Sequence, residues 1–290
     1  MKKVILGGAQ LGLNYGITNT LGMLSEDAAA QLLRHARLAG IDTIDTAPGY
    51  GESQQRLGKC AAGDFKYVSK VSVNGLSDPS DIKNEIKTSL HKTLKDLQVS
   101  NLSALLVHDV TPMLASSCVK NVVIETLQEL KASGLIMAGG VSLYNSTQSK
   151  MLCSDWLPDV IQLPVSILNQ DMVNSGELRR LHAAGTEIHA RSIFMQGVAL
   201  LKTLPEQLHW GNSLIEPYYQ LLQKNNITPM QASLAYINSV AEIDAVVAGF
   251  HSIVQLDEFV SCADYCFPDA EYISVNINNE EFTNPARWLK

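Results

Sequence analysis

Residues 42–58 read Asp-Thr-Ile-Asp-Thr-Ala-Pro-Gly-Tyr-Gly-Glu-Ser-Gln-Gln-Arg-Leu-Gly and join a strand-like run to the start of a helix. The apolar run ends at Asp45, and the Pro48-Gly49 turn that follows leads to Tyr50. The stretch therefore predicts a carboxylate and a phenol side by side at the carboxyl end of a strand. A phenol ordinarily ionises near pH 10, so it is a poor acid at neutral pH unless a nearby cation favours the phenolate.

Short β-rich runs alternate with longer helical runs through the rest of the chain. Strands are predicted at residues 4–7, 41–45, 66–71, 103–107, 137–141, 159–163, 186–190 and 243–248. An apolar stripe with helical spacing, such as the one over residues 82–97, lies between successive strands. Eight strands alternating with helices over about 250 residues predict the α/β class and a (β/α)8 TIM barrel.

A doubly wound parallel sheet is the competing architecture. It lacks support because residues 7–12, Gly-Gly-Ala-Gln-Leu-Gly, do not match the G-x-G-x-x-G turn of such folds. No phosphate-binding loop of the G-x-x-x-x-G-K type occurs either. Because no linker-like segment interrupts the pattern, we expect a single barrel domain over residues 1–266 and a polar tail over residues 267–290.

Composition excludes several classes of protein. The 290 residues are 46% hydrophobic and carry a net charge of −7 without a long basic run, so we expect neither a nucleic-acid partner nor a membrane surface. No apolar stretch approaches the roughly 18 residues of a membrane span. Residues 1–14 superficially imitate a signal peptide, but Gln10 and Asn14 interrupt the apolar run, and we interpret residues 4–7 as the first strand.

The five cysteines are scattered, and only Cys262 and Cys266 lie close in sequence. No second pair or nearby histidine completes a zinc pattern, so no metal site is expected. Unpaired thiols favour a cytoplasmic location. The sequence gives no indication of the oligomeric state.

Polar or charged residues end six successive apolar runs, which is where a barrel of this class carries its chemistry. These residues are Asp45, Lys70, His108, Ser142, Gln162 and the pair Arg191-Ser192. Each one alone has a structural explanation, since Asp45 could cap a turn and His108 could be a core histidine. Their joint occurrence favours a functional site.

The order Asp45, Tyr50, Lys70, His108 resembles the catalytic tetrad of the aldo-keto reductases. Residues 45–53 match the motif D-T-A-x-x-Y-G-x-S of that family, while residues 68–71 and 105–108 look like its lysine and histidine strands. The resemblance extends from about residue 4 to 260. It implies an oxidoreductase that reduces a small aldehyde or ketone with NADPH or NADH.

The roles of the tetrad also follow from physical chemistry. Hydride transfer to a carbonyl carbon leaves negative charge on the oxygen, and a proton must neutralise this charge. Lys70 beside Tyr50 would stabilise the phenolate, and Asp45 would pair with Lys70. His108 would donate a hydrogen bond to the carbonyl oxygen.

The resemblance also implies a set of cofactor contacts. Ser142 and Gln162 look like the pair that holds the nicotinamide carboxamide, and Gly249 begins a segment similar to the family's cofactor-phosphate loop. The expected cofactor-binding residues are Ser142, Gln162, Arg191, Ser192, Phe194, Gly197, Gly249, Ser252, Gln255 and Glu258.

Two departures from the family pattern bear on specificity. Arg191 stands where the family places an aromatic side chain, and it could stack on the nicotinamide or bind an anionic, sugar-like substrate. His251 and Gln255 stand where NADPH-preferring relatives carry Lys or Arg, so the charge-assisted clamp for a 2′-phosphate is missing and NADH as well as NADPH is expected as cofactor. We expect residues 72–79, 109–118 and 194–212 to set substrate specificity, and the tail either to close over the site or to pack outside the barrel.

Two other functions remain open. A cofactor-binding regulatory protein could keep this fold with little turnover, although the intact tetrad argues against it. A Schiff-base lyase could use Lys70 as its nucleophile, but it would have no need of Ser142, Gln162 or the Gly249 segment.

Overall fold

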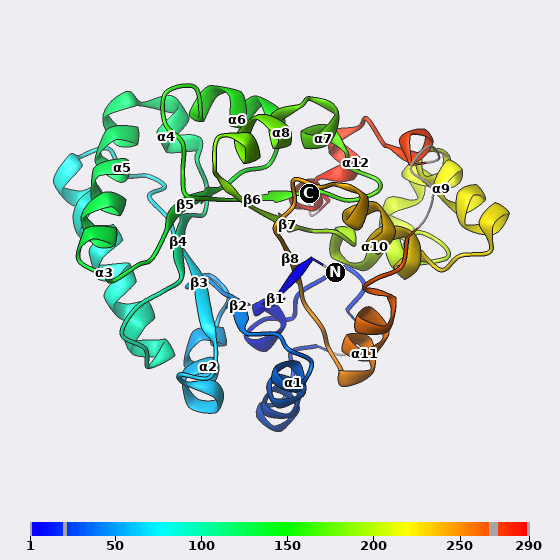
Figure 1. The fold of residues 1–290 in the computed structure, drawn as a ribbon, viewed down its shortest axis with the longest axis horizontal. Coiled ribbons are helices and arrows are strands. Elements are labelled where there is room, and N and C mark those ends of the chain that lie inside the picture. Colours follow the sequence, from blue (N-terminus) through cyan, green and yellow to red (C-terminus); the bar gives the residue numbers. More distant parts are fainter. Residues whose placement is uncertain (1, 20–21, 267–271, 289–290) are drawn as a thin grey trace.

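The computed structural model describes residues 2–19, 22–266 and 272–288, and within these ranges it forms one closed barrel. Neighbouring strands are parallel throughout, and the barrel closes where β1 pairs with β8. The strands are β1 (Lys3–Gly7), β2 (Thr43–Asp45), β3 (Lys66–Val71), β4 (Ala104–Val107), β5 (Gly139–Ser142), β6 (Val160–Pro164), β7 (Glu187–Arg191) and β8 (Ala245–Ala248). The predicted (β/α)8 TIM barrel is confirmed (Figure 1).

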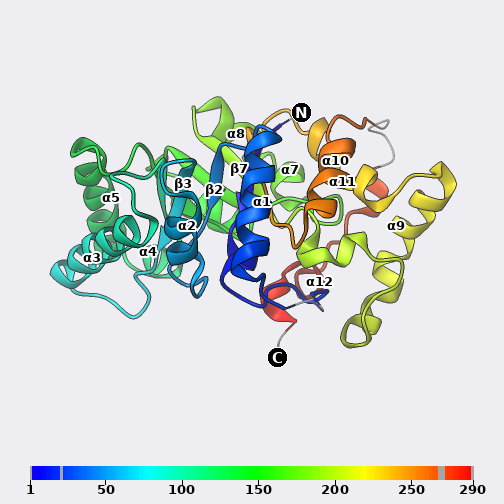
Figure 2. The same cartoon turned by 90° about the horizontal axis from the view of Figure 1, so that it is seen from below.

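Helices surround the barrel and connect its strands (Figures 1 and 2). The α-helices are α1 (Glu26–Leu38), α2 (Ser53–Ala61), α3 (Pro79–Leu97), α4 (Thr111–Ala115), α5 (Ser117–Ala132), α6 (Ser146–Leu152), α7 (Asp171–Asn174), α8 (Glu177–Ala183), α9 (Asn212–Asn225), α10 (Pro229–Ser239), α11 (Ile253–Cys262) and α12 (Glu280–Thr283). Short 3₁₀ turns are η1 (Ala9–Leu11), η2 (Met195–Leu200), η3 (Glu206–Gly211), η5 (Ile273–Val275) and η6 (Pro285–Arg287).

The helices begin and end where local chemistry favours it. Ser25 caps α1 by accepting a hydrogen bond from the Ala28 amide, and Thr228 forms a full capping box at the start of α10. Helix α3 covers the predicted apolar stripe and buries its hydrophobic residues against the sheet. No helix in the described ranges is long and apolar enough to cross a membrane.

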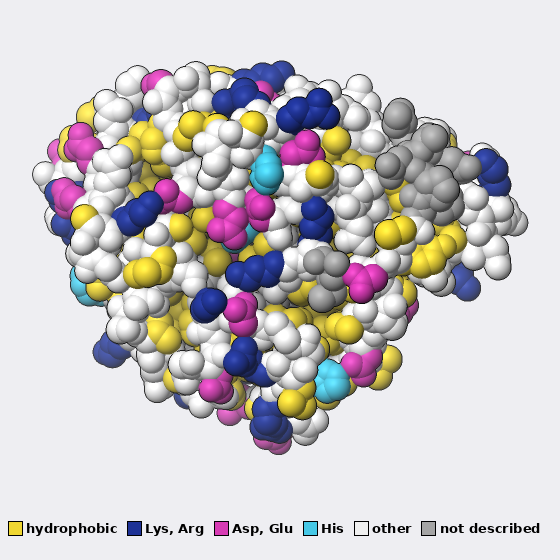
Figure 3. Space-filling model, in the orientation of Figure 1, with side chains coloured by type: hydrophobic (Ala, Val, Ile, Leu, Met, Phe, Trp, Pro, Cys, Tyr) yellow, Lys and Arg dark blue, Asp and Glu magenta, His cyan; other side chains and the backbone are white. Residues whose placement is uncertain are grey.

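Two apolar layers stabilise the barrel. The large one fills the space between the sheet and the helices, and a small one inside the barrel consists of Val68, Ala104, Leu106 and Val160 with Ala138 against them. Polar side chains occupy the carboxyl end of the barrel instead, where the expected site lies. On the outer face shown in Figure 3, basic and acidic side chains are interspersed.

The C-terminal segment returns to the barrel after helix α11. Part of the predicted tail, residues 267–271 and 289–290, is outside the described ranges. The rest is packed against the protein: Phe282 is fully buried, and the Ile277 amide donates to the Leu168 carbonyl over 2.9 Å. Figure 2 shows α12 of this segment at the lower side of the molecule.

Candidate active site

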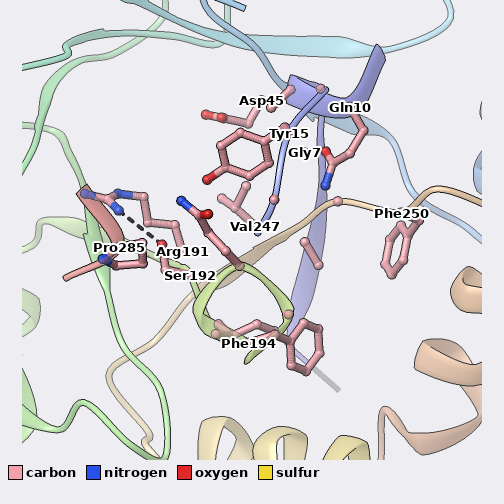
Figure 4. Close-up of a pocket in the computed structure, with 18 of the residues that line it drawn as sticks. Gly7, Gln10, Tyr15, Asp45, Arg191, Ser192, Phe194, Val247, Phe250 and Pro285 are labelled. Carbon is pink, nitrogen blue, oxygen red and sulfur yellow. Dashed lines mark hydrogen bonds between the residues drawn. The ribbon is translucent and has the colours of Figure 1, made fainter. Parts of the chain in front are cut away.

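A pocket of about 470 Å³ opens at the carboxyl end of the barrel (Figure 4). All four members of the predicted tetrad line it, although they come from three strands and one turn. Every predicted cofactor residue except Ser252 also lines it. Because the carboxyl ends of the barrel strands meet at one face, which we call the strand-end rule, residues that are far apart in the sequence line one cavity.

Asp45 and Lys70 form a buried ion pair at the floor of this pocket. The Lys70 Nζ atom lies 2.6 Å from Asp45 Oδ1 and 2.8 Å from Asp45 Oδ2, and it also donates to the Thr46 carbonyl at 3.2 Å. Burial alone would lower the pKa of Lys70, but the Asp45 carboxylate and the Tyr50 hydroxyl raise it above its usual range. Lys70 is therefore an ammonium ion at neutral pH.

The turn after β2 holds Tyr50 above this ion pair. The Tyr50 amide donates to the Ala47 carbonyl at 3.0 Å, and the Lys70 Nζ atom lies 5.1 Å from the centroid of the Tyr50 ring. The loop after β1 packs so closely on the turn that a Cβ at Gly12 would overlap the Tyr50 carbonyl oxygen. Gly51 has φ +56°, a conformation that favours glycine. Glycines at both positions thus fix the place of the phenol.

His108 approaches the phenol from β4. Its ring lies edge-on to Tyr50, with a centroid distance of 6.2 Å and an interplanar angle of 85°. Burial, followed by the positive charge of Lys70, lowers the pKa of His108 to about 4. The imidazole is therefore neutral at pH 7 and has one N–H to donate.

Ser142 ends β5, and Gln162 lies beside it in the middle of β6. The Gln162 side-chain amide donates to Asp45 Oδ2 over 2.7 Å, so this residue orients the carboxylate as well as lining the pocket. Its amide oxygen and the Ser142 hydroxyl have no protein partner in the described ranges. Both oxygens remain able to bind a ligand.

Arg191 lies at the end of β7, where it is held by three contacts. It donates to Ser192 Oγ and to the Leu143 carbonyl, each at 3.2 Å, and its guanidinium carbon lies 4.7 Å from the centroid of the Tyr144 ring. One face of the guanidinium is therefore occupied by an aromatic side chain. Figure 4 shows Arg191 beside Pro285 of the C-terminal segment.

The segment after β7 has an unusual backbone. Ser192 and Gln196 have φ of +56° and +55°, a backbone conformation that residues other than glycine rarely adopt. A Cβ at Gly197 would overlap Thr18, whose hydroxyl donates to the Gln196 carbonyl at 3.2 Å. This segment and the loop after β1 therefore meet beside the pocket. Strain of this kind is found at ligand clamps.

The far end of the pocket is formed by Gly249, His251, Gln255 and Glu258. The predicted contact Ser252 does not line it, because its hydroxyl caps α11 by accepting from the Gln255 amide at 3.2 Å. The Nε2 atom of His251 is buried and has no hydrogen-bond partner among the described residues. Burial lowers the pKa of His251, so this ring is neutral.

Several lining residues were not predicted from the sequence. Gln10, Tyr15 and Phe250 follow β1 and β8, and Tyr144 follows β5, so the strand-end rule could have found them. Burial raises the pKa of Tyr15, which keeps this second phenol in its neutral form. Figure 4 shows Tyr15 near Asp45.

The loops expected to set specificity differ in whether they line this pocket. Residues 72–79 and 109–118 contribute no lining residue to this pocket, whereas residues 194–212 contribute four. Asn284 and Pro285 of the C-terminal segment line it instead. Neither one carries a sequence signal that could have revealed this position.

Comparisons with known proteins bear on the fold and the family of this chain. The chain is similar to the solved structure of an aldo-keto reductase from Bacillus halodurans, with 21% identity and a TM-score of 0.73 over 94% of this chain and 90% of that one. It is also similar to a glycerol dehydrogenase from Gluconobacter oxydans, with 20% identity and a TM-score of 0.70 over 98% of this chain and 92% of that one. These likenesses show the fold.

No curated protein matches the sequence significantly. The sequence profile described as the aldo/keto reductase family, however, matches residues 3–279, which is almost the whole chain. The chain therefore belongs to the aldo/keto reductase family.

Proposed function

We propose that the protein reduces an aldehyde or ketone with NADH or NADPH, and that Tyr50 acts as the general acid. Family membership implies an NAD(P)-dependent oxidoreductase. The observation that carries the finer proposal is the buried Asp45–Lys70 pair directly beneath the Tyr50 ring, in a pocket large enough for small ligands.

The proton transfer follows from the arrangement of these side chains. When bound, a reduced nicotinamide supplies a hydride to the carbonyl carbon. Tyr50 gives its phenolic proton to the carbonyl oxygen, so the product is an alcohol and the phenolate remains. The Lys70 ammonium, held by Asp45, stabilises that phenolate. Neutral His108 donates a hydrogen bond to the same oxygen and orients the substrate.

The chemistry of the pocket suits a nicotinamide dinucleotide. The Ser142 hydroxyl and the Gln162 amide oxygen can hold the carboxamide at the floor. The partnerless Nε2 atom of His251 offers a buried hydrogen-bonding group at the far end. Between them lies the strained segment from Ser192 to Gly197, which we expect to bind the phosphates of the dinucleotide.

We further propose that NADH is preferred over NADPH. Among the lining residues in the described ranges, Lys70 and Arg191 are the cationic ones, and neither belongs to the segment from Gly249 to Glu258. The far end offers Gln255 and the carboxylate of Glu258 instead. A carboxylate accepts hydrogen bonds from ribose hydroxyls but repels a 2′-phosphate, whereas NADPH binding favours a charge-assisted clamp.

The alternative functions are less well supported. A Schiff-base lyase needs an unprotonated lysine, but the pKa of Lys70 is raised and both Asp45 oxygens bind its ammonium group. A regulatory protein would not require a neutral histidine beside the phenol. Turnover distinguishes that function from a reductase.

Fluorescence titration of the protein with NADH and with NADPH tests the proposal. We expect saturable binding of both, with NADH bound about tenfold more tightly, because one charge-assisted contact is missing for NADPH. Equal affinities or tighter NADPH binding would contradict the preference. Absence of binding by a folded protein would contradict the reductase, and binding without turnover over a panel of aldehydes would favour the regulatory function.

A further inference from the structure

A second pocket, of about 580 Å³, lies beside the active-site pocket. It is formed by the loop before α6, the loop before α7 and the C-terminal segment around α12, three segments that lie near one another in Figure 1. Tyr144, Arg191, Asn284 and Pro285 line both pockets. A ligand bound at Tyr50 could therefore extend past Arg191 into this second space.

Asparagine supplies more of the second pocket's lining than any other residue type. The Oδ1 atoms of Asn145 and Asn276 accept hydrogen bonds from the Gln148 and Gln170 amides, each at 2.9 Å. The Oδ1 atom of Asn279 accepts from the Phe282 amide at 3.2 Å. Because these oxygens are committed to the backbone, the side-chain NH₂ groups, which have no partner in the described ranges, are the groups left to bind a ligand.

The charges of this pocket point in the same direction. Lys150 and Arg191 line it, and neither forms an ion pair with a carboxylate in the part of the chain that the structure describes. The two acids in the lining already have partners. Asp171 accepts from the Ser146 amide at 2.7 Å and from its hydroxyl at 2.9 Å, and Glu280 pairs with Arg287 at 3.0 Å.

The lining therefore offers two cations without a carboxylate partner and the NH₂ groups of these asparagines, against one carboxylate, that of Asp171, which pairs with no cation in the described ranges. Such a lining is complementary to a ligand rich in oxygen acceptors that carries negative charge. A neutral apolar aldehyde would leave these donors unpaired if it covered them, which is costly. Sugar-like compounds that bear an acidic group match both features.

We propose that the second pocket is a substrate subsite that binds the anionic, hydroxyl-rich part of a sugar-like carbonyl compound, with a phosphate or carboxylate as its acidic group. The proposal rests on the proposed reductase function, since it places the carbonyl at Tyr50. Arg191 lies at the junction of the two pockets and binds the portion of the substrate between them.

Isothermal titration calorimetry, with and without NADH, tests this subsite. The probes are a hexose 6-phosphate, a hexuronate, inorganic phosphate and an uncharged hexose. The variants are Lys150→Glu and the milder Lys150→Gln. Lys95→Glu is the matched control, because Lys95 is an exposed lysine on α3 that lines neither pocket.

We expect the hexose phosphate or the hexuronate to bind more tightly than the uncharged hexose, and the tighter of the two identifies the acidic group. Lys150→Glu should weaken that binding about tenfold and Lys150→Gln about threefold, whereas Lys95→Glu should leave it unchanged. Binding of inorganic phosphate alone at the same affinity as the sugar phosphate would contradict the hydroxyl-rich part of the proposal.

No saturable binding of either anionic sugar, or equal losses in Lys150→Glu and Lys95→Glu, would overturn the subsite. NADH binding by the wild-type protein is measured in the same series and reports on the reductase separately. If NADH binds and the sugars do not, the subsite is wrong and the reductase stands. If the sugars bind with the expected dependence on Lys150 and NADH does not, the reductase is wrong and the pocket remains a binding site.

Discussion

Tyr50 is the residue on which the proposed chemistry depends. Replacement of Tyr50 with Phe removes one hydroxyl and keeps the ring that faces Lys70 and His108. We expect kcat/KM for aldehyde reduction to fall about 10²- to 10⁴-fold, the usual contribution of a general acid. The affinity for NADH, measured by fluorescence titration, should hardly change. A Tyr50→Phe enzyme with full turnover would refute the tetrad assignment.

Asp45 is expected to matter for stability as well as for catalysis. In Asp45→Asn, the fully buried Lys70 would lose the carboxylate that keeps it charged. We expect the free energy of unfolding to fall by about 3 kcal/mol, since breaking a buried ion pair leaves an uncompensated charge. Urea denaturation measures this change.

Asp42→Asn is the matched control for that substitution. Asp42 pairs with Lys66 at 3.1 Å, and the two residues precede Asp45 and Lys70 by only three and four positions. Both side chains of this second pair are substantially exposed. An exposed pair contributes about 0–1 kcal/mol. Equal losses in the two variants would mean that the Asp45–Lys70 pair is not buried in solution.

At the residue scale, the sequence was most informative at strand ends. Asp45, Lys70 and His108 each follow or interrupt an apolar run. This change from apolar to polar residues by itself predicts a polar carboxyl end of the barrel. Asn284 lies in a polar segment without periodicity, so nothing in its surroundings predicts that it reaches the pocket. The bond between Gln162 and Asp45 was also unpredictable, because it joins strands that are not neighbours in the barrel.

At the scale of elements, periodicity located all eight strands, with shifts of one or two residues at most ends. Strand β5 is predicted at residues 137–141 and observed at Gly139–Ser142. The prediction begins two residues early because Met137 and Ala138 look strand-like in an apolar run, and it stops before the polar Ser142, whereas both ranges include the two glycines. Tertiary packing makes glycine suitable there.

Gly140 shows what that packing requires. A Cβ at this position would overlap the Val160 carbonyl oxygen of the neighbouring strand and lie 2.8 Å from a Leu106 methyl group inside the barrel. We expect Gly140→Ala to lower the free energy of unfolding by about 1–3 kcal/mol or more, the usual cost of overpacking. Thermal denaturation of this variant and of Gly49→Ala provides the comparison.

Gly49 is a suitable control because a Cβ there would meet no atom within 4 Å, and its φ is not positive. Gly49→Ala should therefore change the stability by less than about 0.5 kcal/mol. If Gly140→Ala were equally mild, β5 and β6 would have to be able to separate, and the position of Ser142 and Gln162 would be less rigid than the barrel implies.

At the scale of the whole molecule, the active-site pocket is closed by segments from both halves of the sequence. The C-terminal segment is anchored there by Phe282, whose fully buried ring contacts Trp210 edge-on at 5.7 Å. A Cβ at Gly211 would overlap this ring, so the absence of a side chain at Gly211 makes room for it. The Trp288 side chain donates to the Phe282 carbonyl at 3.0 Å.

Removal of the Phe282 ring tests whether the C-terminal segment closes over the substrate or only packs outside the barrel. Phe282→Ala would leave a cavity and should lower the free energy of unfolding by about 3–5 kcal/mol. Because Asn284 and Pro285 follow directly and line both pockets, we expect KM for the carbonyl substrate to rise more than kcat falls. The matched variant is Trp210→Ala, which removes an exposed partner of the same ring and should change KM little. If Phe282→Ala lowers stability but leaves KM at the wild-type value, the segment serves only to cover the barrel exterior, and substrate is held by the strand-end residues alone.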